Sequence, residues 1–309
     1  MTQARARFFA LLGVIVAMLA VTEALARRAG GLVHAVAHRV NFKLALLERR
    51  GGADFVILGS SRGNDCVEPS PIGPNGASIA TPSSSLPTLE YLAQQSAATP
   101  GLKLAFVELS RRQLQDGSAD VESPGISVDE QTDPVGAFLA RHSALLRGRR
   151  AFAVENWSRL PALVAPSLYD GSEFFHTRWF TEAFVSVGSA APEELAALVP
   201  AQDAATEQTG PEWERVSAGY RRVVDAFRSR GVKVVLYGPP LAARRRAEEC
   251  DPASRAFRAS VAAAAGAPFF DFACAEVPEA WLTDRDEHCG ALGRHRFSTK
   301  LGEVARAVP

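Results

Sequence analysis

The chain has 309 residues, of which 47% are hydrophobic and 22% are charged, a composition typical of a folded globular protein. Lys and Arg together number 34, as do Asp and Glu, so the formal net charge is zero. Proteins that bind nucleic acid usually carry an excess of basic residues for phosphate contacts, so this balance argues against a nucleic-acid partner. The length is enough for one large domain or two small ones.

Residues 1–28 predict a membrane signal. The stretch Phe8–Val21 is apolar throughout apart from one glycine, and basic residues flank it on both sides. An uncleaved signal anchor over about residues 8–26 would just cross a bilayer core of about 30 Å. The alternative is a signal peptide that is cleaved after a small-residue pattern ending at Ala26. Because both flanks are basic, the positive-inside rule does not fix the orientation of the segment.

Residues 29–50 predict a linking helix, because apolar residues recur there at helical spacing. Beyond it, short apolar runs alternate with helical patterns. The runs predicted as strands cover residues 54–58, 77–80, 103–109, 232–237 and 268–272, and the predicted helices cover residues 86–98, 212–230, 252–265 and 297–307. This alternation predicts an α/β fold of the doubly wound, three-layer α/β/α type, with a flavodoxin-like parallel sheet of about five strands.

Residues 111–210 interrupt the alternation. They begin with a polar stretch that has no periodicity, continue with mostly helical patterns, and include several aromatic residues. We interpret them as a mostly helical insertion over the carboxyl edge of the sheet. An excursion of this length within a compact domain is more often functional than accidental.

Two short segments carry residues suited to nucleophilic catalysis. The first is Gly-Ser-Ser-Arg at residues 59–62, directly after the first predicted strand, and the second is His-Cys-Gly-Ala-Leu-Gly at residues 288–293. Both lie near carboxyl ends of predicted strands, which meet at one edge of a parallel sheet. A serine hydroxyl becomes nucleophilic when a base takes its proton, and an imidazole titrates near neutral pH. The sequence therefore predicts Ser61 as nucleophile and His288 as its base.

These segments resemble the SGNH (GDSL-like) hydrolase superfamily, and in particular membrane-anchored bacterial envelope proteins that handle acyl groups on polysaccharides. The resemblance rests on an apolar strand running into the Ser61 segment. It also rests on His288, the glycine five residues later and Phe297-Ser298, and it covers about residues 53–110 and 232–305. It implies an SGNH-like domain over residues 51–309. It also implies a serine-dependent esterase or O-acyltransferase that works through an acyl-enzyme on Ser61, with no metal and no cofactor.

The sequence departs from the family pattern at the catalytic acid. The family usually has Asp three residues before the histidine, where this chain has Arg285. Asp284 and Asp286 lie on either side of that position. We expect Asp286 to be the acid, with Asp284 as the alternative. The site would otherwise work as a Ser–His dyad, and these charges would form a solvated surface run.

A second departure concerns the donors that stabilise an oxyanion. The family often supplies a glycine after the second strand and an asparagine after the third. Here Ser83 or Ser84 takes the first position, and Ser110 takes the second, where it would also serve as a helix N-cap. The backbone N–H of Ser61 needs no particular side chain and is the donor we expect first.

Arg62 directly follows the predicted nucleophile and has two interpretations. Its guanidinium could bind an anionic group of a substrate. It could instead form an ion pair with Asp65, three residues further along the chain. We favour the structural pair.

The chain contains four cysteines, and none of them has the CxxC spacing of zinc or redox motifs. An even number suits two disulfides in an oxidising compartment, although four free thiols fit the sequence as well. If the Ser61 and His288 segments converge, Cys66 and Cys289 come close together, and Cys250 is left to pair with Cys274. Four cysteines allow three connectivities, so this pairing is one choice among them.

The resemblance and the N-terminal signal together imply a single-pass protein of the bacterial cytoplasmic membrane with a periplasmic domain, or a protein secreted after cleavage near Ala26. The expected partners are an acylated glycan or lipid substrate, the membrane and a membrane-bound acyl-transfer partner. A second hypothesis is a catalytically inactive accessory protein that binds a polymer or a membrane partner. The missing Asp and Asn of the family pattern favour this alternative, and the fold does not decide between the two.

Overall fold

The computed structural model describes residues 3–28, 43–44, 47–48, 50–81, 84–110, 192–201, 203, 208–283 and 287–308. The chain divides into two compact units, and each is described by itself. The first comprises Met1–Leu46 with Ser123–Pro166, and the second comprises Leu47–Glu122 with Ser167–Pro309. Most of the predicted linking helix and most of the predicted insertion lie outside the described residues.

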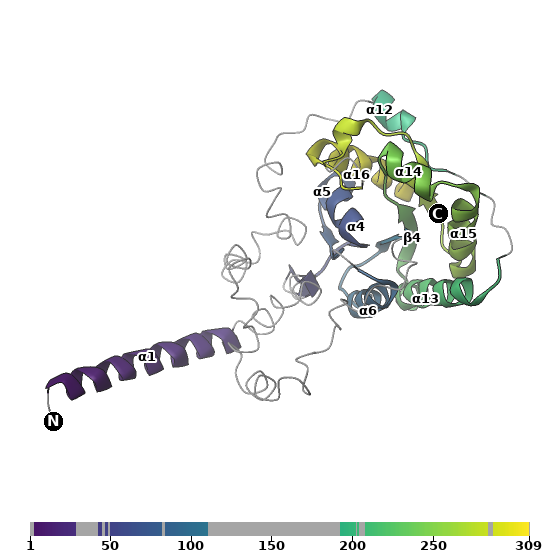
Figure 1. The fold of residues 1–309 in the computed structure, drawn as a ribbon. Helices are drawn as coiled ribbons and strands as arrows, with labels where there is room; N and C mark the ends of the chain where they lie inside the picture. The colour runs from purple at the N-terminus through teal and green to yellow at the C-terminus, as the bar shows by residue number, and fades with distance from the viewer. Residues whose placement is uncertain are drawn as a thin grey trace. The chain divides into compact units, whose positions relative to one another are not determined.

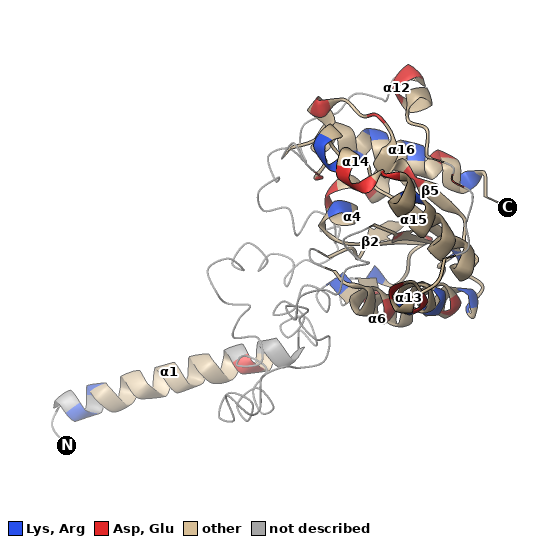
Figure 2. Cartoon of the chain, turned by 45° about the vertical axis from the view of Figure 1, so that its right-hand side comes forward, with Lys and Arg blue, Asp and Glu red and all other residues tan. Residues whose placement is uncertain are grey.

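In the first unit, helix α1 spans Gln3–Arg28. Its large apolar side chains between Phe8 and Val21 are 44–65% exposed. The sequence of α1 contains no charged residue between Arg7 and Glu23, and Figure 2 draws most of this helix in tan. Within the described part of the chain, no helix has both the length and the apolar character of a membrane span.

The second unit is built on a five-stranded parallel sheet with the strand order β2-β1-β3-β4-β5. The strands are β1 Phe55–Leu58, β2 Gly76–Ser78, β3 Leu104–Glu108, β4 Lys233–Gly238 and β5 Phe269–Asp271. Strands that are covered on both faces read as continuous apolar runs, which is why the sequence located them. The structure confirms the predicted three-layer α/β/α fold, and its strand order is the flavodoxin-like one.

Helices cover both faces of this sheet (Figure 1). Helix α13 packs against α6 and α15, whereas α16 packs against α4 and α5. The helices of this unit are α4 Ser61–Cys66, α5 Pro69–Ile72, α6 Leu86–Ser96, α12 Pro192–Ala197, α13 Pro211–Arg228, α14 Ala243–Glu249, α15 Pro252–Ala265 and α16 Ala291–Arg306, with short 3-10 helices η4 Phe272–Cys274 and η5 Glu279–Trp281.

The core on the α16 face contains three completely buried aromatic rings. Phe297 of α16 lies 5.3 Å from Phe272 and 6.2 Å from Tyr237, measured between ring centroids. The sequence placed the start of this helix at Phe297, but α16 begins at Ala291. Gly290 is the N-cap, and the helix continues through Gly293. His288 consequently lies just before a long helix with one buried face.

Candidate active site

Ser61 and His288 meet at the carboxyl edge of the sheet. Strand β1 ends at Leu58 and α4 begins at Ser61, so the chain turns sharply between them. Ser60 caps α4, because its hydroxyl oxygen accepts a hydrogen bond from the amide of Arg62 at 3.2 Å. The Oγ of Ser61 and the Nε2 of His288 lie 3.0 Å apart, although the residues are 227 positions apart in the chain. The structure therefore brings the two residues singled out by the sequence within hydrogen-bond distance.

The completely buried carboxylate of Glu108 lies beneath this turn, at the end of β3. Its Oε2 accepts hydrogen bonds from the amides of Ser60 at 2.7 Å and Gly63 at 3.0 Å, and its Oε1 accepts one from the Ser60 hydroxyl at 2.9 Å. Hydrogen bonds to an ionised acceptor are among the strong ones in proteins, so they fix the turn against β3. Glu108 was not predicted from the sequence. The signal was a lone acidic residue in a strand that otherwise reads as buried.

Two glycines allow the carboxylate to approach the turn so closely. A Cβ at Gly59 would lie 2.5 Å from the Oε2 of Glu108, and one at Gly63 would lie 2.7 Å from the Oη of Tyr237. Tyr237 donates to the carbonyl of Leu58 at 3.4 Å. Burial, and after it the charge of Glu108, raises the pKa of the Tyr237 phenol well above its ordinary value. The phenol therefore stays a neutral donor at physiological pH.

The backbone amides at this turn are used unequally. Those of Ser60 and Gly63 donate to Glu108, and that of Arg62 donates to the Ser60 hydroxyl. Among the described residues, no acceptor lies within hydrogen-bond reach of the Ser61 amide. The donor that the sequence predicted for an oxyanion is thus left available while its neighbours are occupied.

Ser84 and Ser110 follow the two strands that flank β1. Ser84 lies between β2 and α6, and Ser110 comes two residues after the end of β3. Both are buried, and neither hydroxyl has a hydrogen-bond partner within the part of the chain that the structure describes. A buried hydroxyl without a partner is costly, so both remain candidates for contact with a ligand. Ser83, and the residues that would follow Ser110 in a helix, lie outside the described residues.

Arg62 is only 2% exposed and lies between two carboxylates. Its Nη2 is 2.7 Å from the Oε1 of Glu249 and 2.6 Å from the Oε2 of Glu287, and its Nε donates to that same Glu287 oxygen at 2.8 Å. The sequence suggested Asp65 or an anionic substrate as the partner, but Glu249 and Glu287 take this position. Burial alone would lower the pKa of Arg62, but the hydrogen bond to Glu249 and the neighbouring negative charges outweigh it and raise that pKa.

Asp65 lies close to the imidazole instead. It comes four residues after Ser61, one turn along α4, and its Oδ2 is 3.8 Å from the Nε2 of His288. A carboxylate therefore borders the base on the same side as the nucleophile. The helical spacing from Ser61 was the signal that could have identified it. The acids that the sequence did propose, Asp286 and Asp284, lie outside the described residues.

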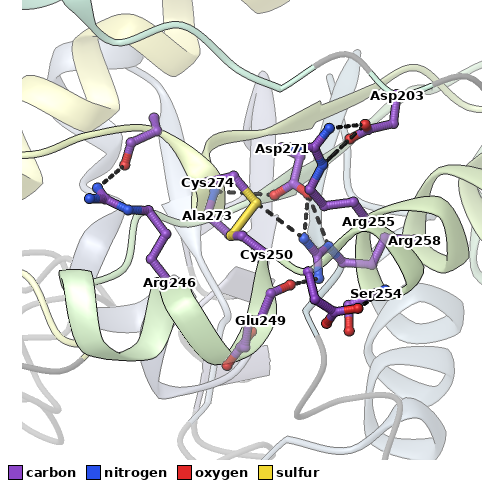
Figure 3. Close-up of a disulfide and its surroundings, with 12 residues drawn as sticks. Asp203, Arg246, Glu249, Cys250, Ser254, Arg255, Arg258, Asp271, Ala273 and Cys274 are labelled. Atoms are coloured by element: carbon purple, nitrogen blue, oxygen red, sulfur yellow. Dashed lines mark hydrogen bonds and ion pairs between the residues drawn. A yellow bond between two sulfur atoms is a disulfide. The ribbon is translucent and has the colours of Figure 1, made fainter.

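The structure contains two disulfides, Cys66–Cys289 and Cys250–Cys274, which is the pairing proposed from the sequence. The first joins the last residue of α4 to the residue that follows His288, across 223 positions. The second joins the residue after α14 to η4 (Figure 3).

The second disulfide adjoins a buried ion pair (Figure 3). The Nη2 of Arg258 lies 2.6 Å from the Oδ2 of Asp271, and its Nη1 donates to the backbone carbonyl of Glu249 at 3.0 Å. Burial raises the pKa of Asp271, and the positive charge of Arg258 opposes that change. The side chain of Glu249 binds Arg62. Its backbone is held by the hydrogen bond from Arg258 to its carbonyl and by the disulfide of the next residue, Cys250.

Among the described residues, no group of three or more His, Cys, Asp or Glu side chains could hold a metal ion. No protein-family model matches the chain, and searches of curated proteins and of solved structures found no match either. The likeness to SGNH hydrolases therefore rests on the motif residues alone.

The first prediction concerns Glu108. Glu108→Ala removes the acceptor of two buried amides, and each unsatisfied buried group costs about 1–3 kcal/mol, so we expect the free energy of unfolding to fall by at least about 2 kcal/mol. Glu108→Gln keeps one oxygen that can accept from both amides and should cost less. Urea unfolding followed by circular dichroism measures both variants. Equal losses would mean that the charge of Glu108 matters rather than its role as an acceptor.

The second prediction compares the disulfides. Chain entropy assigns about 5 kcal/mol to a bridge across 223 positions and about 3 kcal/mol to one across 24 positions. Replacing Cys66 and Cys289 by alanine should therefore lower the thermal midpoint more than replacing Cys250 and Cys274. Scanning calorimetry of the two double variants tests this order, and the reverse order would contradict it.

Proposed function

We propose that this chain is a serine-dependent esterase or O-acyltransferase that acts on an acyl ester of an envelope polysaccharide or lipid. The observation that carries the proposal is the 3.0 Å separation between the Oγ of Ser61 and the Nε2 of His288. The pair lies where parallel α/β sheets bind their ligands, outside the carboxyl ends of the strands. The resemblance to SGNH hydrolases assigns the same roles to the same two residues.

In the proposed reaction, His288 takes the proton of Ser61 at Nε2 while Oγ attacks the carbonyl carbon of the ester. The negative oxygen that forms accepts a hydrogen bond from the amide of Ser61, and the hydroxyls of Ser84 and Ser110 are the further donors that we propose. When the intermediate collapses, the alcohol leaves with the proton from His288, and the acyl group stays on Ser61. Water completes hydrolysis, whereas a second hydroxyl group completes transfer.

A positive imidazolium forms during the attack and needs a negative neighbour. The carboxylate of Asp65, 3.8 Å from Nε2, supplies one on the nucleophile's side. For the other ring nitrogen we propose Asp286, or Asp284, as the partner. Arg62 has no direct part in this scheme, because its guanidinium is buried between Glu249 and Glu287.

We also propose that the domain works outside the cytoplasm of a bacterium. Two disulfides favour an oxidising compartment, and the exposed apolar side chains of α1 favour a signal anchor or a signal peptide cleaved near Ala26. An acylated glycan or lipid is the proposed substrate. A membrane-bound protein that delivers acyl groups is the proposed partner in the case of transfer.

The third prediction tests the chemistry. Ser61→Ala and His288→Ala should each lower kcat/KM for p-nitrophenyl acetate by about 10³-fold or more, because neither residue works without the other. Ser70→Ala, at an exposed serine in α5, and His295→Ala, in α16, are the matched controls and should keep the wild-type rate. Equal rates for the wild type and the two site variants would favour the inactive accessory protein.

The fourth prediction tests the location. In a Gram-negative host, protease added to spheroplasts should digest the domain, while protease added to intact cells should not. A variant that lacks residues 2–28 should stay protected in the spheroplasts. Intact mass of the purified chain distinguishes an uncleaved anchor from cleavage near Ala26. A full-length chain that is digested only after lysis would contradict an extracytoplasmic domain.

A further inference from the structure

We propose that Glu287 is a positioning residue for the base: through its buried ion pair with Arg62, it holds His288 against Ser61. This inference rests on the proposed function, because it assigns a role within the Ser61–His288 pair. It goes beyond that function by assigning Arg62 and Glu287 a role in positioning His288.

The ion pair connects the two halves of the site next to the reacting atoms. Arg62 directly follows Ser61, and Glu287 directly precedes His288. The guanidinium contacts the Oε2 of Glu287 through Nε at 2.8 Å and through Nη2 at 2.6 Å. Both side chains are less than one-tenth exposed, so water screens this attraction little. The chain beside the base is therefore joined to the chain beside the nucleophile by a strong, directional contact.

Cys289, on the other side of His288, is linked to α4, the helix that contains Arg62. Cys289 forms its disulfide with Cys66, the last residue of α4. The carbonyl of His288 itself accepts hydrogen bonds from the amide and the hydroxyl of Thr283, at 2.9 and 3.2 Å. The backbone is thus fixed at three consecutive residues, and the imidazole that it carries has little freedom to move away from Ser61.

Such restraint matters for proton transfer. A displacement of about 1 Å in a reacting group can lower a rate by about 10²-fold. The disulfide fixes the backbone after the histidine but leaves the preceding residue to other contacts. Glu287 supplies that contact, because its carboxylate binds the guanidinium of Arg62, the residue that follows the nucleophile.

Glu249 offers a matched comparison. It binds the same guanidinium, at 2.7 Å, but it is the last residue of α14 and is not adjacent to His288 in the sequence. Removing either carboxylate leaves Arg62 paired with the other one. A loss of charge balance around Arg62 would therefore affect both variants, whereas a loss of positioning would affect only the Glu287 variant.

The experiment measures kcat and KM for p-nitrophenyl acetate in the full-length chain with Glu287→Gln or with Glu249→Gln. We expect Glu287→Gln to lower kcat by about tenfold or more and to leave KM within about twofold, because the contact acts on the base and not on substrate binding. Glu249→Gln should lower the thermal midpoint but keep kcat within about threefold. An unchanged kcat in the Glu287 variant, or equal falls in both variants, would overturn the proposal. If Glu287→Gln does not fold, Glu287→Asp keeps the charge with a shorter side chain, and the same fall in kcat is expected.

A spectroscopic readout separates this proposal from the proposed function. With ¹⁵N-labelled histidine, the Nε2 shift of His288 should change on Ser61→Ala in the wild-type background, which reports the contact between the two side chains. The same shift change on Ser61→Ala should persist in the Glu249→Gln background and disappear in the Glu287→Gln background. If the wild type hydrolyses no ester, the proposed function fails, and this comparison alone decides whether Glu287 positions the imidazole. Persistence of the change in the Glu287 variant would then overturn the inference.

Discussion

The site depends on one buried acceptor, the carboxylate of Glu108. A buried charge is tolerated only when it is paired or bonded, and here the amides of Ser60 and Gly63 and the Ser60 hydroxyl surround it. These contacts join the end of β3 to the turn that presents Ser61. They also explain why glycine is needed at positions 59 and 63, where a Cβ would collide with the carboxylate or with Tyr237. The nucleophile is thus oriented by the sheet itself and not by a surface loop.

The base is oriented by a different set of forces. His288 precedes α16, and Phe297 of that helix is buried in the aromatic core. The packing of α16 therefore sets the distance between His288 and the sheet. An ion pair and a disulfide then fix the neighbouring residues of His288 against α4. Hydrophobic packing accounts for the approach of the two segments, while charge and covalent bonding account for their alignment.

Much of the fold could be predicted, because parallel strands that are covered on both faces appear as short apolar runs between helical segments. The pair Ser61–His288 could also be predicted, since each residue follows a recognisable pattern. The partners of Arg62 could not, because Glu249 and Glu287 lie 187 and 225 residues away in the chain and nothing local marks them. The role of Glu108 could not be predicted for a similar reason, because it depends on β3 being the neighbour of β1 in the sheet. The choice between Asp286 and Asp284 stays a prediction.

Cys66 is the first cysteine of the chain and Cys289 is the last, with the Cys250–Cys274 pair between them. During synthesis from the N-terminus, Cys66 is made long before its partner exists. The native bond can close only after residue 289 has been made, and the Ser61–His288 pair that it flanks likewise needs residue 288. The geometry of the site therefore needs both ends of this domain, and no fragment that ends before residue 288 carries it.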